Sequence, residues 1–182
     1  MKRLQKAALL TALVEKLREA GSWCGETHVQ KATYLLQELL DVPIGFNFIF
    51  YKHGPFSFDL RDELTAMRAD GFLKLQTRAF PYGPSLVATE RSGALQQLYR
   101  RTLDRYDKQL GFVAEKVGSK GVSDLEQLTT ALYVTLEQLG RDTHERAKRI
   151  HELKPHVSVP ESRATIEEFD AIKREVEKLT LE

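Results

Sequence analysis

The sequence predicts a mainly α protein (α+β), with a winged-helix-like first part that carries a short β-ribbon and a helical C-terminal part. Three observations predict this class. Apolar residues recur every three or four positions over most of the chain; one central stretch has the pattern strand, turn, helix, strand; and an extended segment returns after a proline-bearing turn. With 182 residues, the chain is long enough for one substantial core with a helical extension. We expect a winged-helix-like domain over residues 1–98 and an extension over residues 99–182 that packs on it or dimerises.

Two amphipathic helices open the chain. Leu9, Leu13 and Leu17 fall on one face of a helix over residues 3–20, and Gly21 can end it. At the start of the next helix, Thr27 followed three residues later by glutamine is a capping-box pattern. We expect these helices to pack as a hairpin or a helix-turn-helix.

The stretch 46–75 organises the rest of the chain. Phenylalanines at positions 46, 48 and 50 alternate with other side chains, which predicts a largely buried strand. Gly54 and Pro55 predict the turn that ends this strand, and Ser57 is expected to cap the following helix. Gly71 is suited to end that helix before an extended segment begins again.

A β-ribbon is expected next. Residues 73–77 alternate apolar and polar side chains, residues 78–84 form a long turn with two prolines, and residues 85–89 return as a strand. A helix followed by such a ribbon is the arrangement of a winged helix. After this point the chain is expected to be almost entirely helical, with a glycine-bearing break at 118–121, a capping box at Ser123 and a charged terminal helix over 163–179.

Composition predicts a soluble globular protein of the cytoplasm. Apolar residues make up 42% of the chain and charged residues 29%, and no apolar run approaches the about 18 residues that a membrane span needs. The single cysteine, Cys24, cannot form an internal disulfide framework. The net charge of +1 gives no general attraction toward nucleic acid.

A family resemblance covers about residues 25–100. The run from Tyr51 to Ser57, YKHGPFS, enters a helix, and an earlier helix carries the run VQKATYL from Val29. In this order and spacing the two runs resemble the prokaryotic Panacea (SocA-like) antitoxin domain and its uncharacterised relatives. The residues that match the pattern are Lys31, Tyr34, Tyr51, Gly54, Pro55 and Ser57. His53 departs from it, because many relatives pass directly from an aromatic residue to Gly-Pro.

The resemblance implies a non-catalytic module that neutralises or regulates a partner protein encoded alongside it. The hypothesis assigns partner binding to side chains beside the Gly-Pro turn and at the tip of the ribbon: Tyr51, His53, Phe56, Phe80 and Tyr82. Gly54, Pro55 and Ser57 are expected to shape the turn. The aromatic residues at the ribbon tip either pack back on the body or are exposed as an apolar contact.

A DNA-binding transcriptional regulator is the alternative. It would use basic residues of the ribbon and of a later helix: Lys74, Arg78, Arg100, Arg101, Arg105 and Lys108. The helix in the recognition position argues against it. Residues 57–70 hold two arginines against four acidic residues, which is the wrong sign for a phosphate-lined groove.

No catalytic, cofactor or metal site is predicted. Cys24 and His28 are four residues apart, but no second pair completes a tetrahedral zinc site. The chain has no glycine-rich phosphate loop and no G-x-S-x-G elbow. An enzyme would need a convergent polar pocket, which the sequence does not reveal. The apolar stripe of the terminal helix is either buried within the chain or joins two copies as a homodimer.

Overall fold

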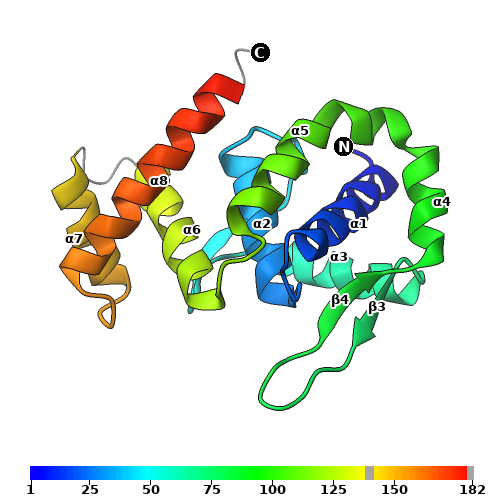
Figure 1. Ribbon diagram of the computed structural model, residues 1–182, viewed down its shortest axis with the longest axis horizontal. Coiled ribbons are helices and arrows are strands. Elements are labelled where there is room, and N and C mark those ends of the chain that lie inside the picture. Colours follow the sequence, from blue (N-terminus) through cyan, green and yellow to red (C-terminus); the bar gives the residue numbers. More distant parts are fainter. Residues whose placement is uncertain (138–141, 180–182) are drawn as a thin grey trace. The chain divides into compact units, whose positions relative to one another are not determined.

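The computed structural model describes residues 1–137 and 142–179 (Figure 1). The described part is mainly helical, which confirms the predicted class. It packs as two compact units: residues 1–48 with 57–120, and residues 49–56 with the segment from Gly121 onward.

The first unit contains five helices and one two-stranded sheet. In chain order they are α1 (Arg3–Glu19), α2 (Glu26–Glu38), α3 (Phe58–Ala69), β3 (Leu73–Gln76), β4 (Ser85–Ala88), α4 (Glu90–Leu98) and α5 (Arg100–Val117).

Helix α1 forms the centre of the first unit (Figure 1). Every residue from Ala7 to Val14 is buried, because α2, α4, α5 and β4 all pack against it. A helix that is covered on all sides needs apolar or small residues on all sides, and the one buried hydroxyl, that of Thr11, donates to the carbonyl of Ala8. The apolar stripe predicted for this helix is therefore only part of its buried surface.

Two helices end in the same glycine-based motif. At the end of α1, Gly21 has φ +92°, its N–H donates to the carbonyl of Arg18, and the N–H of Ser22 donates to that of Leu17. Gly71, with φ +76°, ends α3 in the same way. This pair of bonds is the Schellman motif, which favours glycine because its left-handed conformation strains other residues. Both predicted helix ends are confirmed.

The start of α3 is held by two polar side chains. The hydroxyl of Ser57 accepts from the N–H of Leu60 at 3.2 Å, which confirms the predicted cap. The buried amide of Gln30 bonds both the N–H and the carbonyl of Ser57, at 3.0 and 2.9 Å. The capping box predicted with Thr27 is wrong, because α2 begins after Gly25 and Gln30 serves α3 instead.

Strands β3 and β4 pair antiparallel, with Leu73 opposite Ala88 and Gln76 opposite Ser85. Together with their connecting loop we call them the wing, residues 73–88 (Figure 1). The expected order of a helix followed by a two-stranded ribbon is present.

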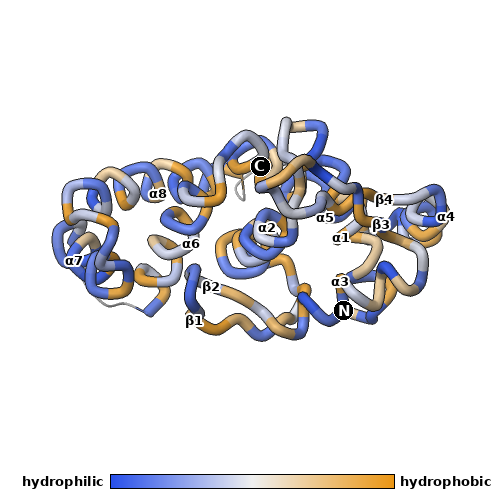
Figure 2. Tube along the Cα trace, turned by 90° about the horizontal axis from the view of Figure 1, so that it is seen from below, coloured by the Kyte–Doolittle hydropathy of each residue, from blue (hydrophilic) through white to orange (hydrophobic). Residues whose placement is uncertain are grey.

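The second unit contains a short β-hairpin and three helices. They are β1 (Ile49–Tyr51), β2 (Gly54–Phe56), α6 (Val122–Leu136), α7 (Thr143–Leu153) and α8 (Val159–Leu179). Hydrophobic and hydrophilic residues alternate along α8 (Figure 2), and its apolar residues Ile166, Phe169, Ile172 and Val176 are buried. Since α8 packs on α6 and α7, its stripe is covered within one chain.

The hairpin corrects the sequence prediction for residues 46–57. Phe50 pairs with Pro55 and Tyr51 with Gly54, so the turn is Lys52-His53 and Gly54-Pro55 belongs to a strand. Pairing begins only at Ile49, because residues 46–48 have no strand beside them. The hairpin packs on α6, where the rings of Phe50 and Tyr133 lie 4.8 Å apart.

Ion pairs join the helices of the second unit. Arg146 of α7 makes a bidentate pair with Asp170 of α8, at 2.8 and 2.7 Å. On α6, Glu126 contacts the buried ammonium of Lys154 at 3.3 Å. The capping box predicted at Ser123 is wrong, since Gly121 precedes the helix and Glu126 points to these partners.

The boundary between the units differs from the expected one at residue 98. Helix α5 packs on α1 and α2, so the first unit continues to Lys120. Among the helices the structure describes, none is both long and apolar enough to cross a membrane.

Candidate functional site

The tip of the wing, residues 79–83, is exposed. Phe80 has 97% of its surface accessible and Tyr82 has 57%. The tip has a turn of its own, in which the N–H of Tyr82 donates to the carbonyl of Ala79 at 3.1 Å. Of the two arrangements left open by the sequence, exposure is the one observed.

The base of the wing is held by a stack of rings around an arginine. The guanidinium of Arg78 lies 5.1 Å from the ring centre of Trp23 and 4.9 Å from that of Tyr82. Such cation–π contacts contribute about 0.5–2 kcal/mol each, depending on burial. The stack fixes the loop to the body beside the exposed tip, so Arg78 is not simply a solvated wing cation.

A pocket of about 380 Å³ opens at this base. We call it the wing-base pocket; its lining residues are Arg18, Ser22, Trp23, Gln76, Thr77, Arg78, Ala79 and Ser85. Arg18 donates to the side-chain oxygen of Gln76 at 3.3 Å. No carboxylate lines the pocket, and Nη1 of Arg78 is buried without a hydrogen-bond partner in the described part of the chain.

The sequence prediction included Arg78 but missed Arg18, Ser22 and Trp23. Arg18 belongs to the last turn of α1 and lies far from the wing in sequence. The available signal was the chain's single tryptophan directly after a predicted helix end, in a connection where a large ring needs a packing partner.

Cys24 and His28 lie next to Trp23, and burial shifts the pKa of both side chains. Burial raises the pKa of the Cys24 thiol to about 12. Burial lowers the pKa of His28, an effect partly opposed by the hydrogen bond between its Nε2 and the carbonyl of Lys120 at 3.0 Å. Within residues 1–137 and 142–179, no three His, Cys, Asp or Glu side chains are grouped so as to hold a metal ion.

The remaining partner-binding candidates lie in the second unit. Tyr51 is 44% exposed and its ring lies 6.0 Å from that of Phe56, which is half-buried. His53, at the hairpin turn, has Nδ1 3.4 Å from Oε1 of Glu126. The five predicted residues are thus divided between the two units, with Phe80 and Tyr82 in the first.

Two of the residues that match the family pattern are core residues. Lys31 and Tyr34 are 2% and 3% exposed, and Tyr34 packs edge-to-face on Phe48 with ring centres 5.0 Å apart. Gly54 and Pro55 are buried in β2, and Ser57 caps α3.

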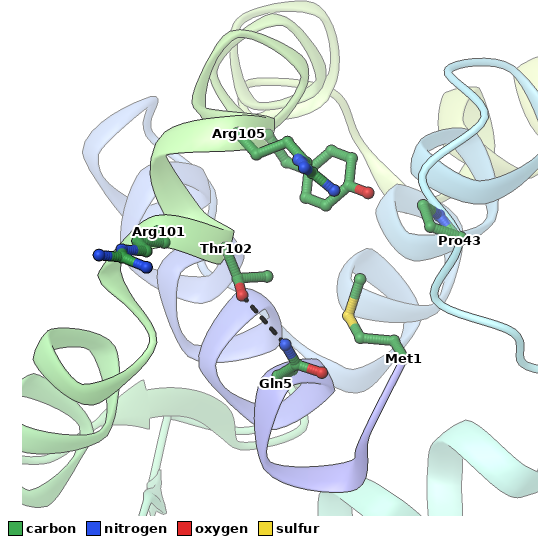
Figure 3. A pocket seen from close by; sticks show the side chains of 7 residues that line it. Met1, Gln5, Pro43, Arg101, Thr102 and Arg105 are labelled. Carbon is green, nitrogen blue, oxygen red and sulfur yellow. Dashed lines mark hydrogen bonds between the residues drawn. The ribbon is translucent and has the colours of Figure 1, made fainter.

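The alternative basic residues are mostly exposed. Lys74 lies on β3, Arg78 lies in the loop that follows it, and α5 carries the other four. Arg101 and Arg105 line a second pocket of about 380 Å³ together with Met1, Gln5, Pro43, Thr102 and Tyr106 (Figure 3). The side chain of Gln5 donates to the hydroxyl of Thr102 at 3.3 Å (Figure 3).

An arginine of α1 partly neutralises the acidic side chains of α3 and its C-cap. Arg3 of α1 pairs with Glu63 at 3.1 Å and with Asp70 at 2.7 Å. These hydrogen bonds, that to Asp70 above all, raise the pKa of Arg3. The counter-charge therefore comes from another helix, and the charge of α3 alone is a weaker argument against DNA than the sequence indicates.

Comparisons with known proteins give no further constraint. No protein-family model matches the sequence, and no curated protein is significantly similar to it.

Proposed function

We propose that this chain is a non-catalytic interaction module, of antitoxin or regulatory type, that binds and controls a partner protein through the tip of its wing. The observation that carries the proposal is the exposure of Phe80, 97% accessible, beside the half-exposed ring of Tyr82. A large apolar side chain in water is unfavourable, and aromatic anchors dominate the energetics of protein interfaces.

The base of the wing supports this proposal. Because the guanidinium of Arg78 contacts the rings of both Trp23 and Tyr82, part of the loop is held to the body before a partner arrives. Ordering side chains on binding costs about 0.5–1.5 kcal/mol each, so a pre-ordered loop binds with a smaller loss.

The proposal is tested by affinity purification of the tagged chain from its own cells, with and without nuclease, followed by mass spectrometry. The wild type is expected to retain one stoichiometric protein after nuclease treatment. A Phe80→Ser, Tyr82→Ser double variant is expected to lose it. Leu98→Ser is the matched control, since Leu98 is an exposed apolar residue, 71% accessible, on α4.

Retention of the partner by the double variant would remove the wing tip from the interface. Loss of the partner in the control as well would show that any exposed apolar residue matters equally, which contradicts a localised surface.

A winged-helix DNA-binding regulator is the second candidate. The observation that favours it is that Arg101, Arg105 and Lys108 are exposed on α5 and none is within ion-pair distance of a described carboxylate. Duplex affinity would then fall steeply with salt and weaken in an Arg101→Gln, Arg105→Gln variant. Fluorescence anisotropy with a labelled duplex tests this; an absent or salt-insensitive signal excludes it.

A further inference from the structure

We propose that the wing-base pocket binds a carboxylate side chain of an acidic segment in the partner protein. This rests on the proposed function, because it supplies the chemistry of the partner that the wing tip contacts. The pocket lies directly behind that tip, and Arg78 and Ala79 belong to both the loop and the pocket lining.

The charge of the lining selects an anion. Two of its eight residues, Arg18 and Arg78, are cationic, and none is acidic. Neither arginine is within ion-pair distance of a carboxylate in the part of the chain that the structure describes. Uncompensated arginines that converge on one pocket favour a carboxylate or phosphate, to which the planar guanidinium can donate two parallel hydrogen bonds.

One donor in the pocket lacks an acceptor. Nη1 of Arg78 is buried and has no hydrogen-bond partner in the part of the chain that the structure describes, although the guanidinium lies close to the rings of both Trp23 and Tyr82. A buried donor left unsatisfied is unfavourable by about 1–3 kcal/mol, more when it is charged. Because Nη1 is closed to solvent, an oxygen of a bound carboxylate would satisfy it by drawing the Arg78 side chain toward the pocket. The hydroxyls of Ser22, Thr77 and Ser85 add further donors around the pocket.

The titratable neighbours do not alter this charge near neutral pH. Burial raises the pKa of the Cys24 thiol to about 12 and lowers the pKa of His28, which in both cases favours the uncharged form. The two arginines are the charged groups that line the pocket.

The stacked rings favour a peptide over a nucleic acid. Proteins bind single strands by stacking bases on free aromatic faces, whereas Arg78 already lies on the rings of Trp23 and Tyr82. The wing instead presents an exposed phenylalanine next to a cationic pocket. A peptide segment that carries an acidic side chain beside an apolar one complements both features.

Trp23 allows a direct test, because it is the only tryptophan of the chain and it lines the pocket. Its fluorescence is recorded while the full chain is titrated with a capped hexapeptide of alternating leucine and glutamate. The same peptide with glutamine in place of glutamate, inorganic phosphate and a duplex DNA are titrated separately. We expect a saturable change with the glutamate peptide, since a bound carboxylate pulls Arg78 relative to the indole, and at least tenfold weaker binding of the glutamine peptide.

Arg18→Gln and Arg78→Gln are each expected to weaken binding of the glutamate peptide at least tenfold. Lys74→Gln is the control that should leave the affinity unchanged, since Lys74 lies on β3 outside the pocket lining. Arg18→Gln leaves the ring stack intact, so its effect reports the pocket rather than the loop. Equal binding of both peptides, unchanged affinity in Arg18→Gln, or a response to phosphate or DNA alone would overturn the proposal.

The two proposals fail separately. If the glutamate peptide binds but purification yields no partner that depends on Phe80 and Tyr82, the pocket stands and the function of the wing tip does not. If a partner depends on the tip but tolerates Arg18→Gln, the function stands and the pocket assignment is wrong.

Discussion

Gln30 shows how one buried amide can fix the start of a distant helix. Its side chain bonds both backbone groups of Ser57, so a change to Gln30→Leu leaves the buried N–H of Ser57 without a partner, while the carbonyl keeps only its bond from the N–H of Arg61. We expect the free energy of unfolding to fall by about 2–4 kcal/mol. Urea denaturation measures it, with Gln97→Leu at an exposed position of α4 as a control that should change it by less than about 0.5 kcal/mol. Equal effects would contradict the role of Gln30.

Gly71 and Gly93 form a matched pair of glycines. Gly71 has φ +76°, and an added Cβ would lie 3.3 Å from Nη1 of Arg91, so Gly71→Ala should destabilise by about 1–2 kcal/mol. Gly93 lies within α4 and an added Cβ would meet nothing within 4 Å, so Gly93→Ala should stabilise by up to about 1 kcal/mol. Thermal unfolding of the two variants should shift in opposite directions; shifts of the same sign would refute the argument.

His28 makes stability depend on pH. Because burial lowers its pKa in the folded chain, the unfolded chain binds the proton at higher pH. Stability from this group is therefore present above the ordinary histidine pKa and is lost as pH falls below it. Between about pH 7.5 and pH 5.5, urea unfolding should show a larger loss for the wild type than for His28→Gln, which keeps a donor for the carbonyl of Lys120. Equal losses would show that other groups dominate.

At the scale of elements, the hairpin β1–β2 and helix α6 meet near Glu126. Its carboxylate is 14% exposed and faces Lys154, whose side chain is 3% exposed. Glu126→Gln leaves that ammonium buried without a counter-charge. We expect the free energy of unfolding of the second unit to fall by about 3 kcal/mol. Adding Lys154→Met should recover part of this loss, because no buried charge remains; chemical denaturation of the three variants measures it. A double variant no more stable than Glu126→Gln would rule out the ion pair as the cause.

Local signals predicted the helices and their ends well. The glycines at 21 and 71 end helices through bonds to carbonyls three to five residues away, and Ser57 caps α3 by a bond to Leu60. Such contacts are set by residues adjacent in sequence, and a single sequence contains them. The capping boxes predicted at Thr27 and Ser123 are absent because of contacts distant in sequence. The side chains of Gln30 and Glu126 bond residues 27 or more positions away instead of the start of their own helix.

The candidate site was predicted only in part. Exposure of Phe80 and Tyr82 depends on whether the body offers a cavity for them; the ring of Trp23 contacts both Arg78 and Tyr82, but Phe80 stays in solvent. The wing-base pocket joins the end of α1 to the wing, a pairing that no local pattern encodes.

At the scale of the whole molecule, the hairpin should lose protection together with the second unit. Hydrogen exchange followed by mass spectrometry tests this in the Glu126→Gln variant. We expect residues 49–56 to exchange faster together with α6. Helices α2 and α3, which precede and follow the hairpin in sequence, are expected to keep the protection of the wild type. Gln30→Leu should do the reverse. If the hairpin followed α3 in both variants, the division into these units would be wrong.

The route of the backbone makes the second unit discontinuous, since it takes residues 49–56 from the first half of the sequence. No single cut can separate the two units intact. A fragment ending at Lys120 would keep the ring of Phe50 but not Tyr133, and one beginning at Gly121 would lack the strands that pack on α6. A gene for residues 1–120 therefore specifies the whole first unit with a hairpin that lacks its partner helix, and a gene for the remainder specifies an incomplete second unit. Recombination, deletion or proteolysis between the halves is penalised in the second unit.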